Sequence, residues 1–106
     1  HLGVRRQRQM CIRDRKILDF YLNQLNDENF DFVFYIAGVD IHHNDRLGKL
    51  KISDKGIKKR DEMVTQNFFS QGVPLCGVLG GGYNKDFKKL VELHSILHQS
   101  CAKLLK

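Results

Sequence analysis

The chain has 106 residues, of which 42% are hydrophobic, and its formal net charge at pH 7 is +6. This length allows at most one ordinary domain, and this hydrophobic content argues against intrinsic disorder. No apolar stretch approaches the roughly 18 residues that a membrane span needs, and the basic first residues lack the apolar segment of a secretory signal. The three cysteines have no metal-like spacing and are typical of reduced thiols. We therefore expect a cytoplasmic protein without a membrane partner.

The positive charge is concentrated at the start of the chain. Residues 1–16 carry six basic residues and one acidic residue, whereas the remaining 90 residues carry 12 basic and 11 acidic ones. A nearly neutral body does not predict a surface that follows nucleic-acid phosphates. Residues 1–15 show neither helical nor strand periodicity, and they resemble translated technical sequence. We interpret them as a non-native or disordered basic leader, with a nucleic-acid-binding arm as the alternative, and residues 16–106 as the domain.

From residue 16 onward the sequence predicts a helix and then a strand. The helix is indicated by one apolar stripe at Ile17, Leu18, Tyr21, Leu22 and Leu25. Residues 32–36 are β-rich and nearly all apolar, which is typical of a parallel strand buried on both faces. The long connection at residues 37–52 is of the kind that tends to be functional.

A second helix is predicted up to about residue 71, with Ser53 as its N-cap and Asp54 in its first turn. Its buried stripe is Ile57, Val64 and Phe68, with Asp61 between them. Gly72 is placed to end this helix, and Pro74 prevents its continuation. The apolar run at residues 74–79 then predicts a second strand. Residues 32–79 therefore form a βαβ unit, whose crossover should be right-handed.

The last helix is predicted to open at residues 84–86. Its apolar stripe is Phe87, Leu90, Val91, Leu97, Cys101 and Leu105, widened by Leu93 and Ile96. Two strands and three helices cannot bury both faces of a parallel sheet. The sequence thus predicts a piece of a larger α/β domain.

Asp40 and Tyr83 are the candidate site residues. Asp40 follows the first strand, and Tyr83 follows the second after the glycines at residues 80–82. Open α/β sheets bind ligands outside the carboxyl ends of their strands, so we expect both side chains at one edge. The carboxylate could be a metal ligand, a general base or an acceptor for loop N–H groups, and the phenol could donate to a developing oxyanion. The nearby Asp45-Arg46 pair is typical of a local turn with an exposed ion pair.

Two histidine pairs have weaker support as metal ligands. His42 and His43 are adjacent, so their side chains diverge, and a solvated loop is the preferred interpretation. His94 and His98 share one helical face at a spacing that zinc can bridge, but no acidic third ligand follows them.

Taken together, these residues resemble the histone deacetylase superfamily, most closely its bacterial, class IV-like branch related to acetoin-utilisation proteins. The resemblance covers roughly residues 17–106. Residues 31–40, followed by Asp45-Arg46-Leu47-Gly48, are similar to the family's second zinc-aspartate segment, and residues 80–83 are similar to its catalytic tyrosine loop. The resemblance implies a three-layer, parallel-sheet α/β fold of the arginase/deacetylase type, present here only as a C-terminal fragment.

The same resemblance implies a zinc-dependent amidohydrolase that removes acetyl groups from lysine or similar acylated amines. Asp40 would be one ligand of the Zn²⁺, and Tyr83 would be catalytic by stabilising the tetrahedral oxyanion. Gly81 and Gly82 would shape the substrate channel.

The family's paired histidines and its Asp-x-His zinc motif have no counterpart in residues 1–31. A catalytic zinc normally takes three protein ligands, and this chain supplies one. We therefore expect a deacetylase fragment whose partner is the missing N-terminal part of its own domain, and which is inactive alone. One alternative is a non-enzymatic α/β module that binds an anion at the Gly80-Gly81-Gly82 turn, although the Lys-Ser/Thr ending of a P-loop is absent. The other is a fragment that binds nucleic acid through its basic leader.

Overall fold

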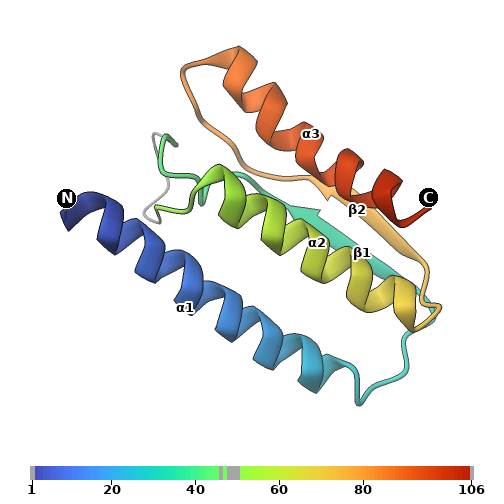
Figure 1. Ribbon diagram of the computed structural model, residues 1–106. Coiled ribbons are helices and arrows are strands. Elements are labelled where there is room, and N and C mark those ends of the chain that lie inside the picture. Colours follow the sequence, from blue (N-terminus) through green and yellow to red (C-terminus); the bar gives the residue numbers. More distant parts are fainter. Residues whose placement is uncertain (1, 46, 48–50, 106) are drawn as a thin grey trace.

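The computed structural model describes residues 2–45, 47 and 51–105. Its elements are α1 (Leu2–Leu25), β1 (Val33–Ala37), α2 (Asp54–Ser70), β2 (Leu75–Leu79) and α3 (Phe87–Leu104), as shown in Figure 1. This order of helix, strand, helix, strand, helix confirms the predicted one, and the chain is a small α/β protein.

The two strands are parallel neighbours, in a register that runs from Val33 opposite Leu75 to Ala37 opposite Leu79. In Figure 1 both arrowheads point to the left, toward the end of the molecule where α2 and α3 begin. The carboxyl ends of the strands and the N-termini of these helices therefore share one end of the fold, as the βαβ prediction requires.

Local capping chemistry fixes the ends of α2 and the start of α3. The Ser53 hydroxyl accepts a hydrogen bond from the Gly56 N–H (3.1 Å), which satisfies one of the free donors of the first turn. Gly72 follows α2 at φ +71°, a conformation that glycine adopts without steric cost. The Asp86 carboxylate accepts from the Lys89 N–H (3.2 Å) at the start of α3. The predicted N-cap of α2 and its glycine stop are confirmed.

The helices cover one face of the sheet. Near the carboxyl ends of the strands, one core cluster consists of Val39, Ile52, Ile57 and Leu93. A second cluster joins α1 to α2 through Leu22, Val64 and Phe68, and Val33, Tyr35 and Leu75 pack against it from the strands. Gly77 of β2 faces α3, because a Cβ built there would lie 2.7 Å from a methyl carbon of Leu97. The core therefore lies between the sheet and its helices.

The opposite face of β1 is exposed. Phe34 and Ile36 are 71% and 72% exposed, whereas Ala37 on the helix-covered side is 2% exposed. The prediction that this strand is buried on both faces is wrong for this chain, because none of the described elements packs against the second face. The second helical layer of a three-layer fold stays a prediction.

Two helices differ from their sequence predictions. α1 begins at Leu2 rather than near residue 16, so the expectation that residues 1–15 lack helical structure is wrong from residue 2 onward. The assignment of those residues as a non-native leader stays a prediction. In α3 the buried residues are Leu93, Leu97 and Ser100, whereas Phe87 is 76% exposed. The predicted stripe therefore spans a buried face and an exposed one.

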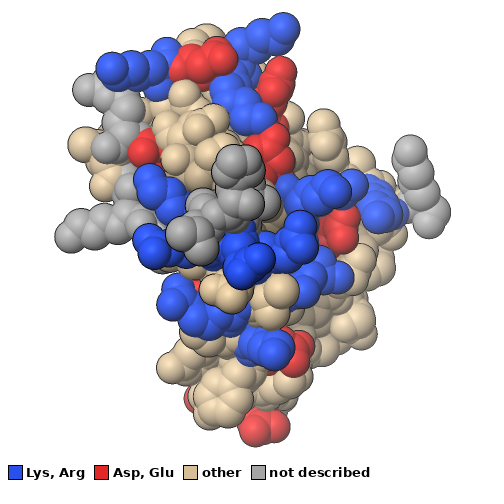
Figure 2. Space-filling model, turned by 60° about the vertical axis from the view of Figure 1, so that its left-hand side comes forward, with Lys and Arg blue, Asp and Glu red and all other residues tan. Residues whose placement is uncertain are grey.

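Most of the charged side chains on the face that Figure 2 turns toward the viewer are Lys and Arg. That view brings forward the end of the molecule where α2 and α3 begin. Within the described ranges, no helix combines the length and the apolar character needed to cross a membrane.

Candidate functional site

The carboxyl ends of β1 and β2 continue into two loops that contact each other directly. The Val39 N–H donates a hydrogen bond to the Gly81 carbonyl oxygen (2.8 Å). A Cβ built at Gly80 would lie 2.9 Å from the Cα of Gly38, closer than real Cβ atoms approach a backbone. Glycine at position 80 thus lets the second loop pass against the end of β1.

Asp40 lies beside this glycine turn. A Cβ built at Gly81 would lie 3.3 Å from the Asp40 carboxylate, so carboxylate and turn are neighbours. At Gly82 a Cβ would lie 2.8 Å from both Val39 and Leu90, so this position is filled by packed side chains. The structure therefore places Asp40, Gly81 and Gly82 at one edge, and Gly82 faces the core cluster rather than open space.

Asp45 connects the two loops through its side chain. It is 8% exposed, and its Oδ2 accepts a hydrogen bond from the Tyr83 backbone N–H (2.6 Å), while its Oδ1 accepts from the Leu47 N–H (2.9 Å). The bond to Leu47 agrees with the predicted local turn, but the bond to Tyr83 was not anticipated. Arg46 and Gly48 of the same motif lie outside the described residues. Tyr83 itself is 49% exposed, so its side chain is open to a ligand.

A network of buried polar side chains connects α2 to the loop that follows β1. Asp61 of α2 is 1% exposed and accepts hydrogen bonds from the Tyr35 hydroxyl (2.5 Å) and the Arg60 Nε (3.0 Å). Arg60 also donates to the carbonyl oxygen of Gly38, two residues before Asp40. Burial raises the pKa of Tyr35, and the carboxylate of Asp61 adds to this effect, whereas Arg60 opposes it. The signal in the sequence was an aspartate inside the apolar stripe of α2.

His42 is buried, which contradicts the interpretation of His42 and His43 as a solvated loop. His42 is 1% exposed, its Nδ1 accepts from the Asn44 N–H (3.2 Å), and its Nε2 lies 2.5 Å from Asp54 Oδ1. Nε2 therefore carries the proton and donates to Asp54, which also pairs with Lys89 of α3. Burial lowers the pKa of His42, and the hydrogen bond to Asp54 partly offsets this. His42 thus joins the loop to the first turns of two helices.

His94 and His98 lie in different surroundings. His94 is half-buried beside Gly82, whose Cβ would lie 3.2 Å from its Nε2, whereas His98 is exposed. Burial lowers the pKa of His94, and the charge of Arg60 lowers it further. Among the residues that the structure describes, no three His, Cys, Asp or Glu side chains form a group that could hold a metal ion.

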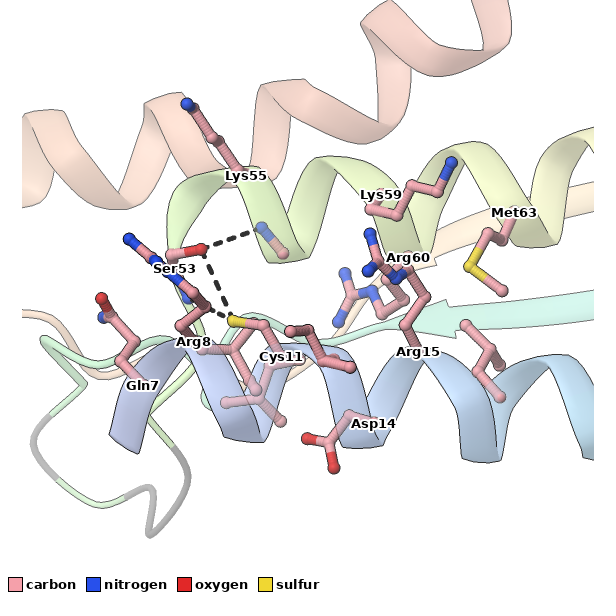
Figure 3. A pocket seen from close by; sticks show the side chains of 15 residues that line it. Gln7, Arg8, Cys11, Asp14, Arg15, Ser53, Lys55, Lys59, Arg60 and Met63 are labelled. Carbon is pink, nitrogen blue, oxygen red and sulfur yellow. Dashed lines mark hydrogen bonds between the residues drawn. The ribbon is translucent and has the colours of Figure 1, made fainter. Parts of the chain in front are cut away.

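A separate cleft of about 580 Å³ lies between α1 and the first half of α2. Figure 3 shows Arg8 and Arg15 on the α1 side and Lys55, Lys59 and Arg60 on the α2 side. Neither Asp40 nor Tyr83 lines it. This cleft is therefore separate from the candidate site.

The fold and the edge together define an α/β protein whose candidate site follows two adjacent parallel strands. Comparison with known proteins identifies the family. The histone deacetylase domain family matches residues 15–96. An uncharacterised protein of Picosynechococcus sp. is 46% identical over 70 residues, which cover 66% of this chain and 23% of that protein. Histone deacetylase 2 of Arabidopsis thaliana is 38% identical over 81 residues, which cover 69% of this chain and 21% of that protein.

The chain belongs to the histone deacetylase family, a family of hydrolases. The resemblance to this family is thereby confirmed. The chain spans less than a quarter of the length of both relatives.

A catalytic zinc ion of the kind that the resemblance implies does not fit the described residues by themselves. Such an ion takes about three protein ligands and a water molecule. Asp40 is one suitable carboxylate, but it lies against the glycines at positions 38 and 81, which bring no ligand side chain. The described residues thus supply part of a metal site and not a complete one.

Proposed function

We propose that this chain is the C-terminal part of a zinc-dependent deacetylase that hydrolyses acetyl-lysine or a similar acylated amine. In the complete enzyme, Asp40 is one of the ligands of Zn²⁺, and the remaining ligands and the catalytic histidines come from the preceding part of the domain. The chain alone is expected to bind zinc weakly and to be inactive.

The observation that carries this proposal is the joint position of Asp40 and Tyr83. They are 43 positions apart, yet their loops share the Val39 to Gly81 hydrogen bond. Tyr83 is half exposed, so its phenol is free to donate to the oxyanion of a tetrahedral intermediate. Gly81 leaves room for the Asp40 carboxylate. We assign Gly81 and Gly82 to the wall of the substrate channel, Gly82 through its backbone, because its Cβ direction faces the core.

The charges at the glycine turn disfavour the anion-binding alternative. Asp40 lies against the turn, and Asp45 already accepts the Tyr83 N–H. Asp86 accepts an N–H group of the first turn of α3. These carboxylates would repel a bound anion, and they occupy N–H donors that it would need.

The genomic sequence upstream of residue 16 provides the first test. An in-frame extension that encodes a His-His pair and an Asp-x-His segment is the expected result, because these groups complete the zinc site. A start codon directly ahead of the basic leader would contradict the proposal.

The role of Tyr83 is tested in the enzyme restored in this way. Tyr83→Phe should lower kcat by about 10²–10³ and leave the zinc content unchanged, because it removes one oxyanion donor and no metal ligand. Tyr21→Phe is the matched control, since Tyr21 is a 57% exposed tyrosine on α1 and away from the edge. Unchanged turnover in Tyr83→Phe, or loss of zinc, would remove the assigned role.

A further inference from the structure

Among the described side chains, Asp45 forms a hydrogen bond with the backbone of Tyr83. Its Oδ2 lies 2.6 Å from the Tyr83 nitrogen and its Oδ1 lies 2.9 Å from the Leu47 nitrogen. The carboxylate is itself fixed, because the Asp45 N–H donates to the His42 carbonyl oxygen (3.0 Å) and the residue is 8% exposed. Two N–H donors from different loops therefore converge on one buried carboxylate.

The segment at residues 80–83, which Asp45 binds, is one whose conformation is fixed by few constraints of its own. Three consecutive glycines precede Tyr83, and glycine has the largest conformational freedom of any residue. The Val39 to Gly81 hydrogen bond fixes the turn on one side of Gly82. The bond from Tyr83 to Asp45 fixes it on the other side. A hydrogen bond to an ionised acceptor is also stronger than one between neutral groups.

We infer that Asp45 is the positioning residue for Tyr83, and that it sets the place of the phenol by holding the backbone from which it projects. The inference rests on the proposed function only for the role of Tyr83 as oxyanion donor. In this inference Asp45 acts through the Tyr83 backbone and not on the reacting atoms. Its loss should therefore lower kcat, which depends on where the phenol lies, and leave KM nearly unchanged.

The direct test is residue-resolved hydrogen exchange on the 106-residue chain. Asp45→Asn keeps the shape of the side chain but removes its charge, so the Tyr83 N–H either faces the new NH₂ group and loses its acceptor or keeps a weaker bond to a neutral oxygen. The Tyr83 amide should exchange about 3- to 100-fold faster, the upper value corresponding to complete loss of a hydrogen bond to a charged group. Asp86→Asn is the matched control, since Asp86 also accepts a backbone N–H but at Lys89 (3.2 Å). It should leave the Tyr83 amide unchanged.

An unchanged Tyr83 amide in Asp45→Asn would overturn the inference, and so would equal acceleration at Tyr83 in the two variants. If circular dichroism shows that Asp45→Asn unfolds the chain, the unmodified chain decides. Its Tyr83 amide must then exchange at least tenfold more slowly than in an unstructured peptide, and exchange at the peptide rate would overturn the inference. These results do not depend on deacetylase activity.

Kinetics in the restored enzyme separate positioning from a general structural effect. Asp45→Asn should lower kcat in the presence of Tyr83 but have little further effect in the Tyr83→Phe background, because its action passes through the phenol. Equal loss in both backgrounds would refute the positioning role. If exchange at Tyr83 responds as expected while Tyr83→Phe leaves kcat unchanged, the contact stands and the proposed function of Tyr83 fails.

Discussion

Replacing Phe34 and Ile36 by threonine should convert the chain from an associating species into a monomer. Both side chains lie on the uncovered face of β1 and are 71% and 72% exposed. Complete burial of such a side chain is worth about 1.5–3 kcal/mol, so covering the exposed part of both is worth about 2–4 kcal/mol. This corresponds to roughly 30- to 1,000-fold in an association constant. Threonine keeps the β-propensity of the strand while removing most of the apolar surface.

Sedimentation velocity over a dilution series measures this effect, and the fluorescence of a hydrophobic dye reports the exposed face. The unmodified chain should associate and bind dye, and the double variant should do both much less. Phe69→Thr is the matched control, because Phe69 is 54% exposed but lies on α2, on the covered side of the sheet. A monomeric unmodified chain that does not bind dye would refute the reasoning, and so would an equal effect of Phe69→Thr.

Three further predictions can be measured by urea unfolding in this monomeric background. Gly82→Ala should destabilise the chain by about 1–3 kcal/mol through overpacking, because the new Cβ would lie 2.8 Å from Val39 Cγ2; an unchanged midpoint would contradict this. Tyr35→Phe removes the hydrogen bond to Asp61 (2.5 Å) and should cost about 1.5–3 kcal/mol, whereas a loss below about 0.5 kcal/mol would show that the bond contributes little. Since burial lowers the pKa of His42, the unfolded chain binds the proton more tightly, and stability should be lost as the pH falls below about 6.5. His42→Gln should reduce this pH dependence, and an unaltered slope would exclude His42 as a source of it.

The local signals in the sequence were sufficient to predict the order of the elements and to place the candidate site at the carboxyl ends of β1 and β2. Ser53 and Gly72 delimit α2 through interactions with residues close in the sequence, so these helix ends can be predicted without knowledge of the tertiary structure. The parallel βαβ unit then brings the ends of both strands together by geometry alone. This is why Asp40 and the glycine turn could be placed at one edge from the sequence.

The partners of polar side chains could not be predicted in the same way. His42 and Asp45 lie in a loop, where periodicity says nothing about burial, and each finds a partner distant in the sequence. In α3 the apolar residues extend around more than one face, so the pattern could not tell which side meets α2. In α1 the first residues carry no apolar stripe, yet the helix begins at Leu2. Sequence periodicity identifies faces that can be buried, but only the tertiary contacts decide which ones are.

The two hydrogen bonds between the loops also determine how the site can move. The Val39 to Gly81 bond and the Asp45 to Tyr83 bond tie the segment after β1 to the segment after β2. Arg60 ties the first of these segments to α2 as well. Asp40 and Tyr83 therefore lie on loops that are hydrogen-bonded to each other. If the proposed site opens or closes, these bonds favour a movement in which the two loops shift together against the structure that packs on them.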